Sequence, residues 1–157
     1  MTDRIARKLE ELGLALPTAA APVASYVPSV DAGGLLHISG QLPFKEGKVV
    51  TGRLGDGMDK VAGQEAAELC ALMLVSQMRA ALGGDLGRVE RIVKLGVFVA
   101  SAPDFTDQPE VANGASNLLE ALFGEAGKHA RSAVGVAALP RGAAVEIDAV
   151  VKIAPLP

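Results

Sequence analysis

An arginine and a glutamate lie on two neighbouring strand-like segments near the C-terminal end of the sequence. Arg131 opens the first segment, and Glu146 lies in the second, after a break over residues 139–142. From Val145 to Lys152, the residues Val, Ile, Ala and Val alternate with Glu, Asp, Val and Lys, which is typical of a strand with one face in the core. A guanidinium and a carboxylate on rigid strands could bind a small anion and activate a water beside it. An exposed ion pair at the margin of a sheet is the alternative that the spacing leaves open.

The first third of the chain is predicted to form a helix, a linker and three strands. A short amphipathic helix is expected from Thr2 to Leu12, with Gly13 as its stop. Residues 16–22 contain two prolines and are expected to link this helix to the first strand. The predicted strands and connections are, in order, a strand at Val23–Val27, a turn at Ser29–Gly34, a strand at Leu35–Gly40, a strand at Lys48–Thr51 and a loop at Gly52–Asp59.

The remainder of the chain is predicted to alternate helices and strands. The longest helix is expected from Asp59 or Lys60 to Leu82, because apolar residues recur there at three- and four-residue spacing. A largely apolar strand at Val89–Ala100 and a helix from Gln108 or Val111 to Phe123 precede the two C-terminal strands. The predicted class is α+β, a single domain over residues 1–157 in the order βββ-α-β-α-ββ, with residues 1–20 forming the N-terminal helix and linker.

Three blocks of sequence resemble one protein family. The first is R-S-x-V-x-V-x-x-L-P from Arg131, followed by V-E-I-D-A from Val145. The second is Tyr26 with the segment I-S-G-Q-L-P at 38–43, and the third is V-F-V at 97–99 with Asp-Phe at 104–105. The blocks occur in the order found in the RidA/YjgF family of reactive-intermediate deaminases, whose older name is L-PSP endoribonuclease. The chain is similar to that family from about residue 21 to its end, and its extra N-terminal helix and longer 52–63 segment resemble a longer branch.

The resemblance implies a fold, an assembly and a reaction. The implied fold is chorismate-mutase-like, with two helices packed on one face of a mixed sheet. The implied assembly is a homotrimer whose ligand sites lie between adjacent subunits. The implied reaction is the hydrolysis of a 2-imino or enamine acid to a 2-oxo acid and ammonia, without a cofactor.

The resemblance also implies roles for individual residues. Arg131 would bind the substrate carboxylate, since guanidinium offers a planar fork that lysine lacks. Glu146 would position or activate the hydrolytic water as a general base. The expected substrate-binding residues are Tyr26 through its hydroxyl, Ser39 and Gly40 through a backbone-lined wall, Ala133 through its backbone, and Asn113 at the position closest to a helix asparagine of the family.

Two positions depart from the family pattern. Ala133 stands where many members have cysteine, which removes thiol chemistry from this site. Gly135 stands where they have glutamate, and it is expected to make the cleft roomier and less acidic. Three functions therefore remain open: an imine deaminase, a non-catalytic trimer that binds small carboxylates, and an endoribonuclease. Only the deaminase requires Glu146, whereas both of the first two functions require Arg131.

Composition weighs against nucleic acid as a partner. The net charge is −3, the cationic residues are scattered, and the chain has no Trp and one Tyr. A nucleic-acid surface needs a clustered basic stripe or stacking aromatics. The endoribonuclease function therefore has little support, and the expected partners are those that the resemblance implies: a small imino or oxo acid and two further copies of the chain.

No cofactor or metal is expected from the sequence. Gly52, Gly55 and Gly57 lack the G-K-[ST] of a phosphate loop, and His37 and His129 lack the spacing of metal ligands. Cys70 is alone in a predicted helix interior, where a thiol is usually a small buried hydrophobe. No run of roughly 20 apolar residues predicts a membrane span, and the N-terminal segment lacks a signal-peptide pattern, so a cytoplasmic protein is expected.

Overall fold

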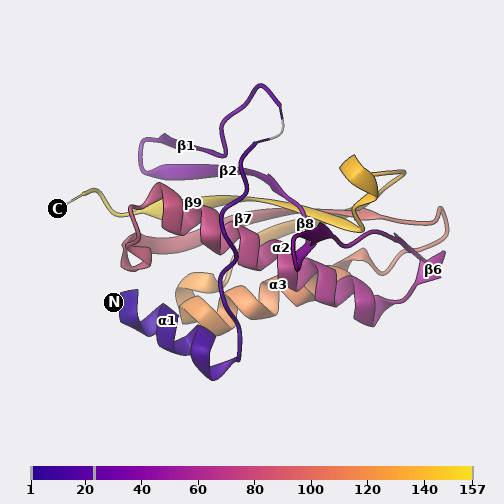
Figure 1. The fold of residues 1–157 in the computed structure, drawn as a ribbon, viewed down its shortest axis with the longest axis horizontal. Helices are drawn as coiled ribbons and strands as arrows, with labels where there is room; N and C mark the ends of the chain where they lie inside the picture. Colours follow the sequence, from indigo (N-terminus) through magenta and orange to yellow (C-terminus); the bar gives the residue numbers. More distant parts are fainter. Residues whose placement is uncertain (1, 23, 157) are drawn as a thin grey trace.

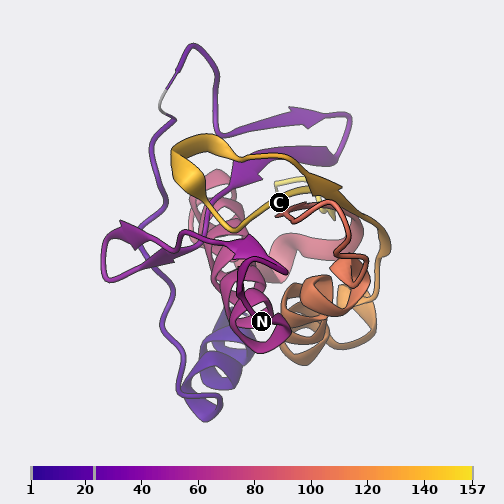
Figure 2. The ribbon, with the colours of Figure 1, turned by 90° about the vertical axis from the view of Figure 1, so that its right-hand side faces the viewer.

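The computed structural model describes residues 2–22 and 24–156. Its centre is a five-stranded sheet in the order β1-β2-β9-β7-β8, in which β8 runs parallel to β7 and the other neighbours are antiparallel. Two long helices lie on the same side of this sheet (Figure 1 and Figure 2). The strands are β1 (Ser29–Ala32), β2 (Leu35–Gln41), β7 (Val89–Ala100), β8 (Ala130–Val136) and β9 (Val145–Ile153). The predicted α+β arrangement, a mixed sheet with two helices on one face, is confirmed.

The N-terminal helix and its linker lie against the helical layer rather than the sheet. Helix α1 (Thr2–Glu11) buries Ile5 and packs against the second long helix. The linker then runs along the first long helix, where the Ser76 hydroxyl donates to the Pro17 carbonyl at 2.7 Å and the Gln77 amide donates to the Ala20 carbonyl at 2.8 Å. These bonds fix the path by which the chain reaches the sheet.

The first strand begins later than predicted. Val23 lies outside the described residues, residues 24–28 form bends and coil, and β1 begins at Ser29. The predicted strand at Val23–Val27 and the predicted turn at Ser29–Gly34 are therefore wrong. The connection to β2 consists of Gly33 and Gly34 alone, both at positive φ (64° and 84°). Such a two-residue glycine turn suits the twist of a hairpin, so the residues before it stay in the strand.

The predicted third strand does not join the central sheet. It is β4 (Lys48–Val49), which pairs with β3 (Phe44–Lys45) in a separate hairpin. The segment predicted as a loop contains two more short strands, β5 (Arg53–Leu54) and β6 (Gly57–Met58).

The helical layer consists of α2 (Lys60–Ala81) and α3 (Gln108–Phe123). The Asp59 carboxylate caps α2 by accepting from the backbone N–H of Ala62 at 2.8 Å. A Cβ at position 114 would collide with the backbone of Gln64, so a glycine there lets α3 approach α2 closely. None of the helices in the described part of the chain is long and apolar enough to span a membrane.

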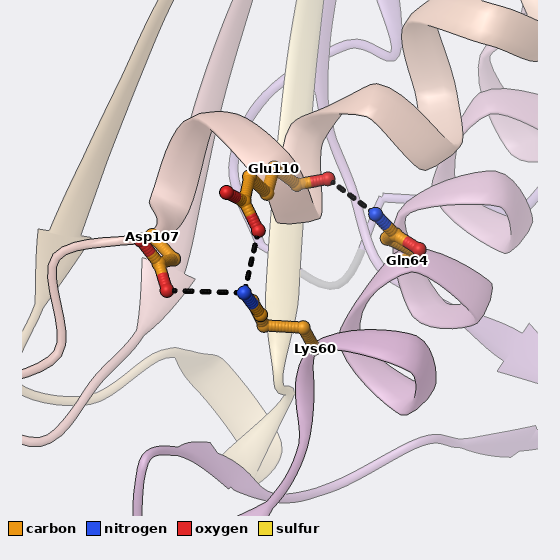
Figure 3. A network of polar contacts seen from close by, with 4 residues as sticks. All are labelled: Lys60, Gln64, Asp107 and Glu110. Carbon is orange, nitrogen blue, oxygen red and sulfur yellow. Dashed lines mark hydrogen bonds and ion pairs between the residues drawn. The ribbon is translucent and has the colours of Figure 1, made fainter.

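An ion-pair network joins the first turns of the two long helices (Figure 3). The Lys60 ammonium on α2 lies 2.7 Å from the Glu110 carboxylate and 3.3 Å from the Asp107 carboxylate. The Gln64 amide donates to the Glu110 backbone carbonyl at 2.9 Å. The network therefore fixes the start of α3, the helix that carries part of the candidate site.

Candidate functional site

Strand register assigns the predicted site residues to two different faces of the sheet. Leu95 on β7 pairs with Arg131 on β8 and with Ala149 on β9, and both Leu95 and Ala149 are buried beneath the helices. Paired residues in a sheet point to the same side, so Arg131 lies on the helix-covered face. Phe98 on β7 pairs with Glu146 on β9. These two residues are three positions away from Leu95 and Ala149, so their side chains point to the opposite face of the sheet, which none of the described helices covers.

Three hydrogen bonds hold Arg131 against α3. Its Nη1 donates to the Asn113 Oδ1 at 2.9 Å and to the Ser116 Oγ at 3.0 Å. Its Nη2 donates to the Pro109 backbone carbonyl at 3.1 Å. A guanidinium has five N–H donors, so two remain for a ligand. Arg131 is half-buried at the edge strand β8, which suits capture of an anion that arrives from solvent.

A histidine completes this network. The Nδ1 of His129 lies 2.6 Å from the Gly127 carbonyl, and its Nε2 lies 2.9 Å from the Ser116 Oγ. Burial, and secondarily the charge of Arg131, lower the pKa of His129, although the Gly127 hydrogen bond and Glu120 act to raise it. A surface pocket of about 230 Å³ is lined by Ser116, Glu120, Gly127, Lys128, His129 and Arg131. We call these residues, with Asn113, the cationic half of the candidate site.

Ala133 and Gly135 lie beyond Arg131 on β8 and share its face, because alternate residues of a strand point the same way. Ala133 pairs with Val97, and its side chain is half-buried. A side chain at position 135 would collide with the Gln108 amide and press on the Ser101 hydroxyl. The Gln108 amide therefore lies in part of the space that the glycine leaves open.

The helix-free face carries two carboxylates over two glycines. A Cβ on Gly40 would collide with the Glu146 carboxylate, and a Cβ on Gly96 would collide with that of Asp148. The Asp148 Oδ1 accepts a hydrogen bond from the Gly96 N–H at 3.1 Å. Among the described residues, none donates a hydrogen bond to the Glu146 side chain, which leaves its oxygens for a water.

Burial is the main cause of the raised pKa values of Glu146 and Asp148. It raises the pKa of Glu146, and the charge of Asp148 raises it further. Burial also raises the pKa of Asp148, against the lowering effects of the Gly96 hydrogen bond and the Lys94 ammonium. A raised pKa makes the ionised Glu146 a stronger base than an exposed glutamate, as a general base requires.

Tyr26 and Ser39 lie near Gly40, the glycine that faces the Glu146 carboxylate. The Ser39 hydroxyl donates to the Val27 carbonyl at 2.9 Å, which ties the bend that carries Tyr26 to β2. Tyr26 is 46% exposed and shares a small pocket with Gly40 and Arg141. We call Tyr26, Ser39, Gly40 and Glu146 the acidic half of the candidate site.

The structure therefore groups the seven predicted residues but does not bring them all together in one chain. Arg131, Asn113 and Ala133 lie on one side of the sheet, and the acidic half lies on the other. The sequence interpretation missed Ser116, Asp148 and Arg141. Asp148 was detectable, since it follows Glu146 at the spacing of residues on the same face of a strand.

Cys70 takes no part in either half. It is fully buried in α2, and its Sγ lies 3.6 Å from the Val145 carbonyl. Burial, and then the charge of Glu146, raise the pKa of this thiol well above its ordinary value, so it stays protonated and unreactive. Within residues 2–22 and 24–156, no cluster of three His, Cys, Asp or Glu side chains could hold a metal ion.

Comparison with known proteins identifies the class to which this fold and site belong. The model of the Endoribonuclease L-PSP family matches residues 17–153. The chain therefore belongs to the Endoribonuclease L-PSP family, also known as the RidA/YjgF family. The chorismate-mutase-like fold predicted from the sequence is confirmed with it.

Individual relatives span nearly the whole chain. Protein TCP17 of Trypanosoma cruzi is 57% identical over 97% of this chain and 96% of its own length. The 2-iminobutanoate/2-iminopropanoate deaminase of Escherichia coli K12 is 32% identical over 87% of this chain and 94% of its own length. The crystal structure of Atu1372 from Agrobacterium tumefaciens, a protein described as of unknown function, has a TM-score of 0.92 and 51% identity, covering 98% of this chain and 94% of that one.

Proposed function

We propose that this protein hydrolyses 2-imino and enamine acids to 2-oxo acids and ammonia, without a cofactor. The observation that carries the proposal is that one chain supplies both a guanidinium fixed by three hydrogen bonds and, on the other face of its sheet, a half-buried carboxylate left open to water. The similarity to a relative named 2-iminobutanoate/2-iminopropanoate deaminase supports the substrate class.

The proposed reaction uses both halves of the site. Arg131 holds the substrate carboxylate and so places the adjacent C=N carbon beside a water. Glu146 accepts a proton from that water as its oxygen bonds to the carbon, and the C=N double bond becomes a C–N single bond. The same carboxyl group returns the proton to the nitrogen. The C–N bond then breaks as the hydroxyl oxygen forms the C=O bond and gives its proton to the departing ammonia. An iminium acid and one water thus give a 2-oxo acid and an ammonium ion.

The proposal requires more than one chain for each site, because the two halves lie on opposite faces of the sheet. A homotrimer, in which the cationic half of one subunit meets the acidic half of the next, would complete the site. The helix-free face suits burial against a second copy, since it exposes Val30 and Val134 at about half of their surface. Edge strand β8, which carries Arg131, has a sheet neighbour on one side.

A non-catalytic binder of small carboxylates is the second candidate. The observation that favours it is that Arg131 is fully positioned within one chain, so carboxylate binding does not need Glu146. The two candidates differ in turnover alone.

The test is ammonia release from freshly generated 2-aminoacrylate, with and without the protein, alongside light scattering at micromolar concentration. We expect accelerated ammonia release and the mass of a trimer. Pyruvate binding without any acceleration would establish the binder, and a monomeric or dimeric mass would contradict the shared site.

A further inference from the structure

We propose that Ser116 and His129 are positioning residues of the carboxylate site: both hold the Arg131 guanidinium in place, and His129 takes up a proton when a small carboxylate binds. This inference rests on the proposed function, because it assumes that Arg131 meets the ligand. It assigns a role to two residues that lie outside the chemistry of imine hydrolysis.

The hydrogen-bond partners of His129 determine which of its nitrogens carries the proton. The Gly127 carbonyl can only accept, so the Nδ1 of His129, 2.6 Å away, must donate to it. In the neutral ring, Nε2 is then an acceptor, and the Ser116 hydroxyl at 2.9 Å donates to it. The Ser116 oxygen in turn accepts from the Nη1 of Arg131 at 3.0 Å. The hydrogen bonds therefore run in one direction, from Arg131 through Ser116 and His129 to the backbone.

This directed chain restricts the guanidinium. Asn113 and Pro109 hold two further positions on Arg131, so the group is fixed from α3 at three points. Ser116 is the only one of these acceptors that is itself oriented by another side chain. Loss of either Ser116 or His129 should therefore let the guanidinium tilt while its charge remains.

Proton uptake by His129 changes the hydrogen bond that the Ser116 hydroxyl can donate. A protonated Nε2 would donate to the Ser116 oxygen, which has two lone pairs and can accept from both His129 and Arg131. The hydroxyl hydrogen would then be released toward the pocket that Ser116, His129 and Arg131 line together. A carboxylate oxygen in that pocket is the acceptor that would use it.

The surrounding charges set the direction of this coupling. Arg131 on β8 and Arg91 on β7 lower the pKa of His129, whereas Glu120 on α3 raises it. Lys128 also lines the pocket and pairs with Glu125 at 3.0 Å. A bound carboxylate would offset the charge of Arg131 and so raise the pKa of His129. By reciprocity, carboxylate binding should strengthen as pH falls through that pKa.

Pyruvate is the probe for the first test, since it is the 2-oxo acid that hydrolysis of 2-aminoacrylate would give. Ser116→Ala and His129→Ala should each weaken pyruvate binding roughly ten-fold and raise KM for 2-aminoacrylate by a similar factor, with kcat within about two-fold. Ser116→Thr keeps the hydroxyl and should restore binding. Asn117→Ala is the matched control on the same helix, because Asn117 is exposed and lines a different depression with Leu12 and Leu14.

Proton uptake is measured by NMR on the same protein. The chain has two histidines, so their ring signals can be titrated separately. Saturating pyruvate should move the midpoint of His129 to higher pH. The shift of His129 should disappear in Arg131→Lys.

The outcomes separate this inference from the proposed function. If Arg131→Lys loses pyruvate while folded Ser116→Ala and His129→Ala bind it as the wild type does, the positioning role is wrong and the carboxylate site stands. If Arg131→Lys binds pyruvate normally, the carboxylate site itself is misplaced. An unchanged His129 midpoint in saturating pyruvate would overturn the proton coupling.

Discussion

The two halves of the candidate site are built in opposite ways. On the helix-covered face, Arg131 makes three hydrogen bonds to α3, and its orientation is complete within one chain. On the helix-free face, the Glu146 carboxylate is half-buried over Gly40 and accepts no hydrogen bond from any described residue. A group that recognises an anion works best when its direction is fixed, whereas a group that takes a proton works best when its lone pairs are available. This contrast suits the cationic half to substrate binding and the acidic half to proton transfer.

The largest expected effect comes from the acidic half. Glu146→Gln keeps the shape of the side chain but cannot take a proton, so turnover of 2-aminoacrylate should fall by roughly 10²–10⁴-fold. Pyruvate binding should change little, because Arg131 rather than Glu146 holds the carboxylate. Steady-state ammonia release and calorimetric titration of pyruvate measure the two quantities. A wild-type rate in a folded Glu146→Gln protein would remove the general-base role.

The next effect comes from the cationic half. Arg131→Lys retains the charge but loses the fork and the bonds to Asn113, Ser116 and Pro109. Pyruvate binding should weaken by about 1.5–3 kcal/mol, roughly ten- to a hundred-fold, and turnover at low substrate should fall with it. Calorimetric titration with pyruvate measures this change in binding free energy. A near-native affinity would show that the guanidinium does not bind the carboxylate.

A smaller effect concerns the cost of burying two acids on one face. The pKa of Asp148 is raised in the folded state, so ionised Asp148 lowers stability progressively as pH rises through that pKa. Asp148→Asn should therefore raise Tm by about 1–2 °C at pH 7, a modest change because solvent screens a partly exposed group. The gain should vanish below about pH 3.9, where an unfolded aspartate is itself protonated. Thermal melts across pH measure it, and a gain that is largest in acid would have the wrong sign.

The smallest effect concerns the anchor of α3. Lys60→Met removes the ion pairs to Glu110 and Asp107, which are about half exposed. Hydrogen bonds to Glu110 and then Asp107 raise the pKa of Lys60, so this contribution is present at neutral pH and lost as pH rises through that pKa. Tm should fall by under about 1 °C, and pyruvate affinity should fall slightly through the displaced Pro109 carbonyl. A large loss of turnover with unchanged pyruvate affinity would contradict the link from this network to the cationic half.

The spacing of apolar residues correctly predicted helices and strands whose ends carry a signal in the nearby sequence, such as a capping residue. The strand at Val89–Ala100 and the helix from Lys60 match the structure, and the helix starts where Asp59 caps it. The strand at Val23–Val27 was wrong because its valines suit a strand, while Pro22 and Pro28 flank it and the Gly33-Gly34 turn places the hairpin further on. Local propensity contains no information about which glycines make the turn.

The sequence predicted several residues of the candidate site, but it did not predict on which face of the sheet each of them lies. Motif resemblance selected Arg131, Asn113 and Glu146, and the alternation of β9 predicted that Glu146 leaves the core. The opposite facing of Arg131 and Glu146 depends on the register between β7, β8 and β9, which joins residues far apart in the sequence. Ser116 was missed for the same reason, since its role depends on the packing of α3 against β8.

Subunit mixing tests the central claim that each site takes its two halves from different chains. Arg131→Lys and Glu146→Gln proteins, each poorly active alone, are unfolded together, refolded as mixed trimers and assayed for ammonia release. Random assembly of equal amounts should restore about a quarter of wild-type activity, because one interface in four would combine an intact Arg131 from one chain with an intact Glu146 from its neighbour. Trimers that mix, as shown by mass, but recover no activity would contradict the shared site.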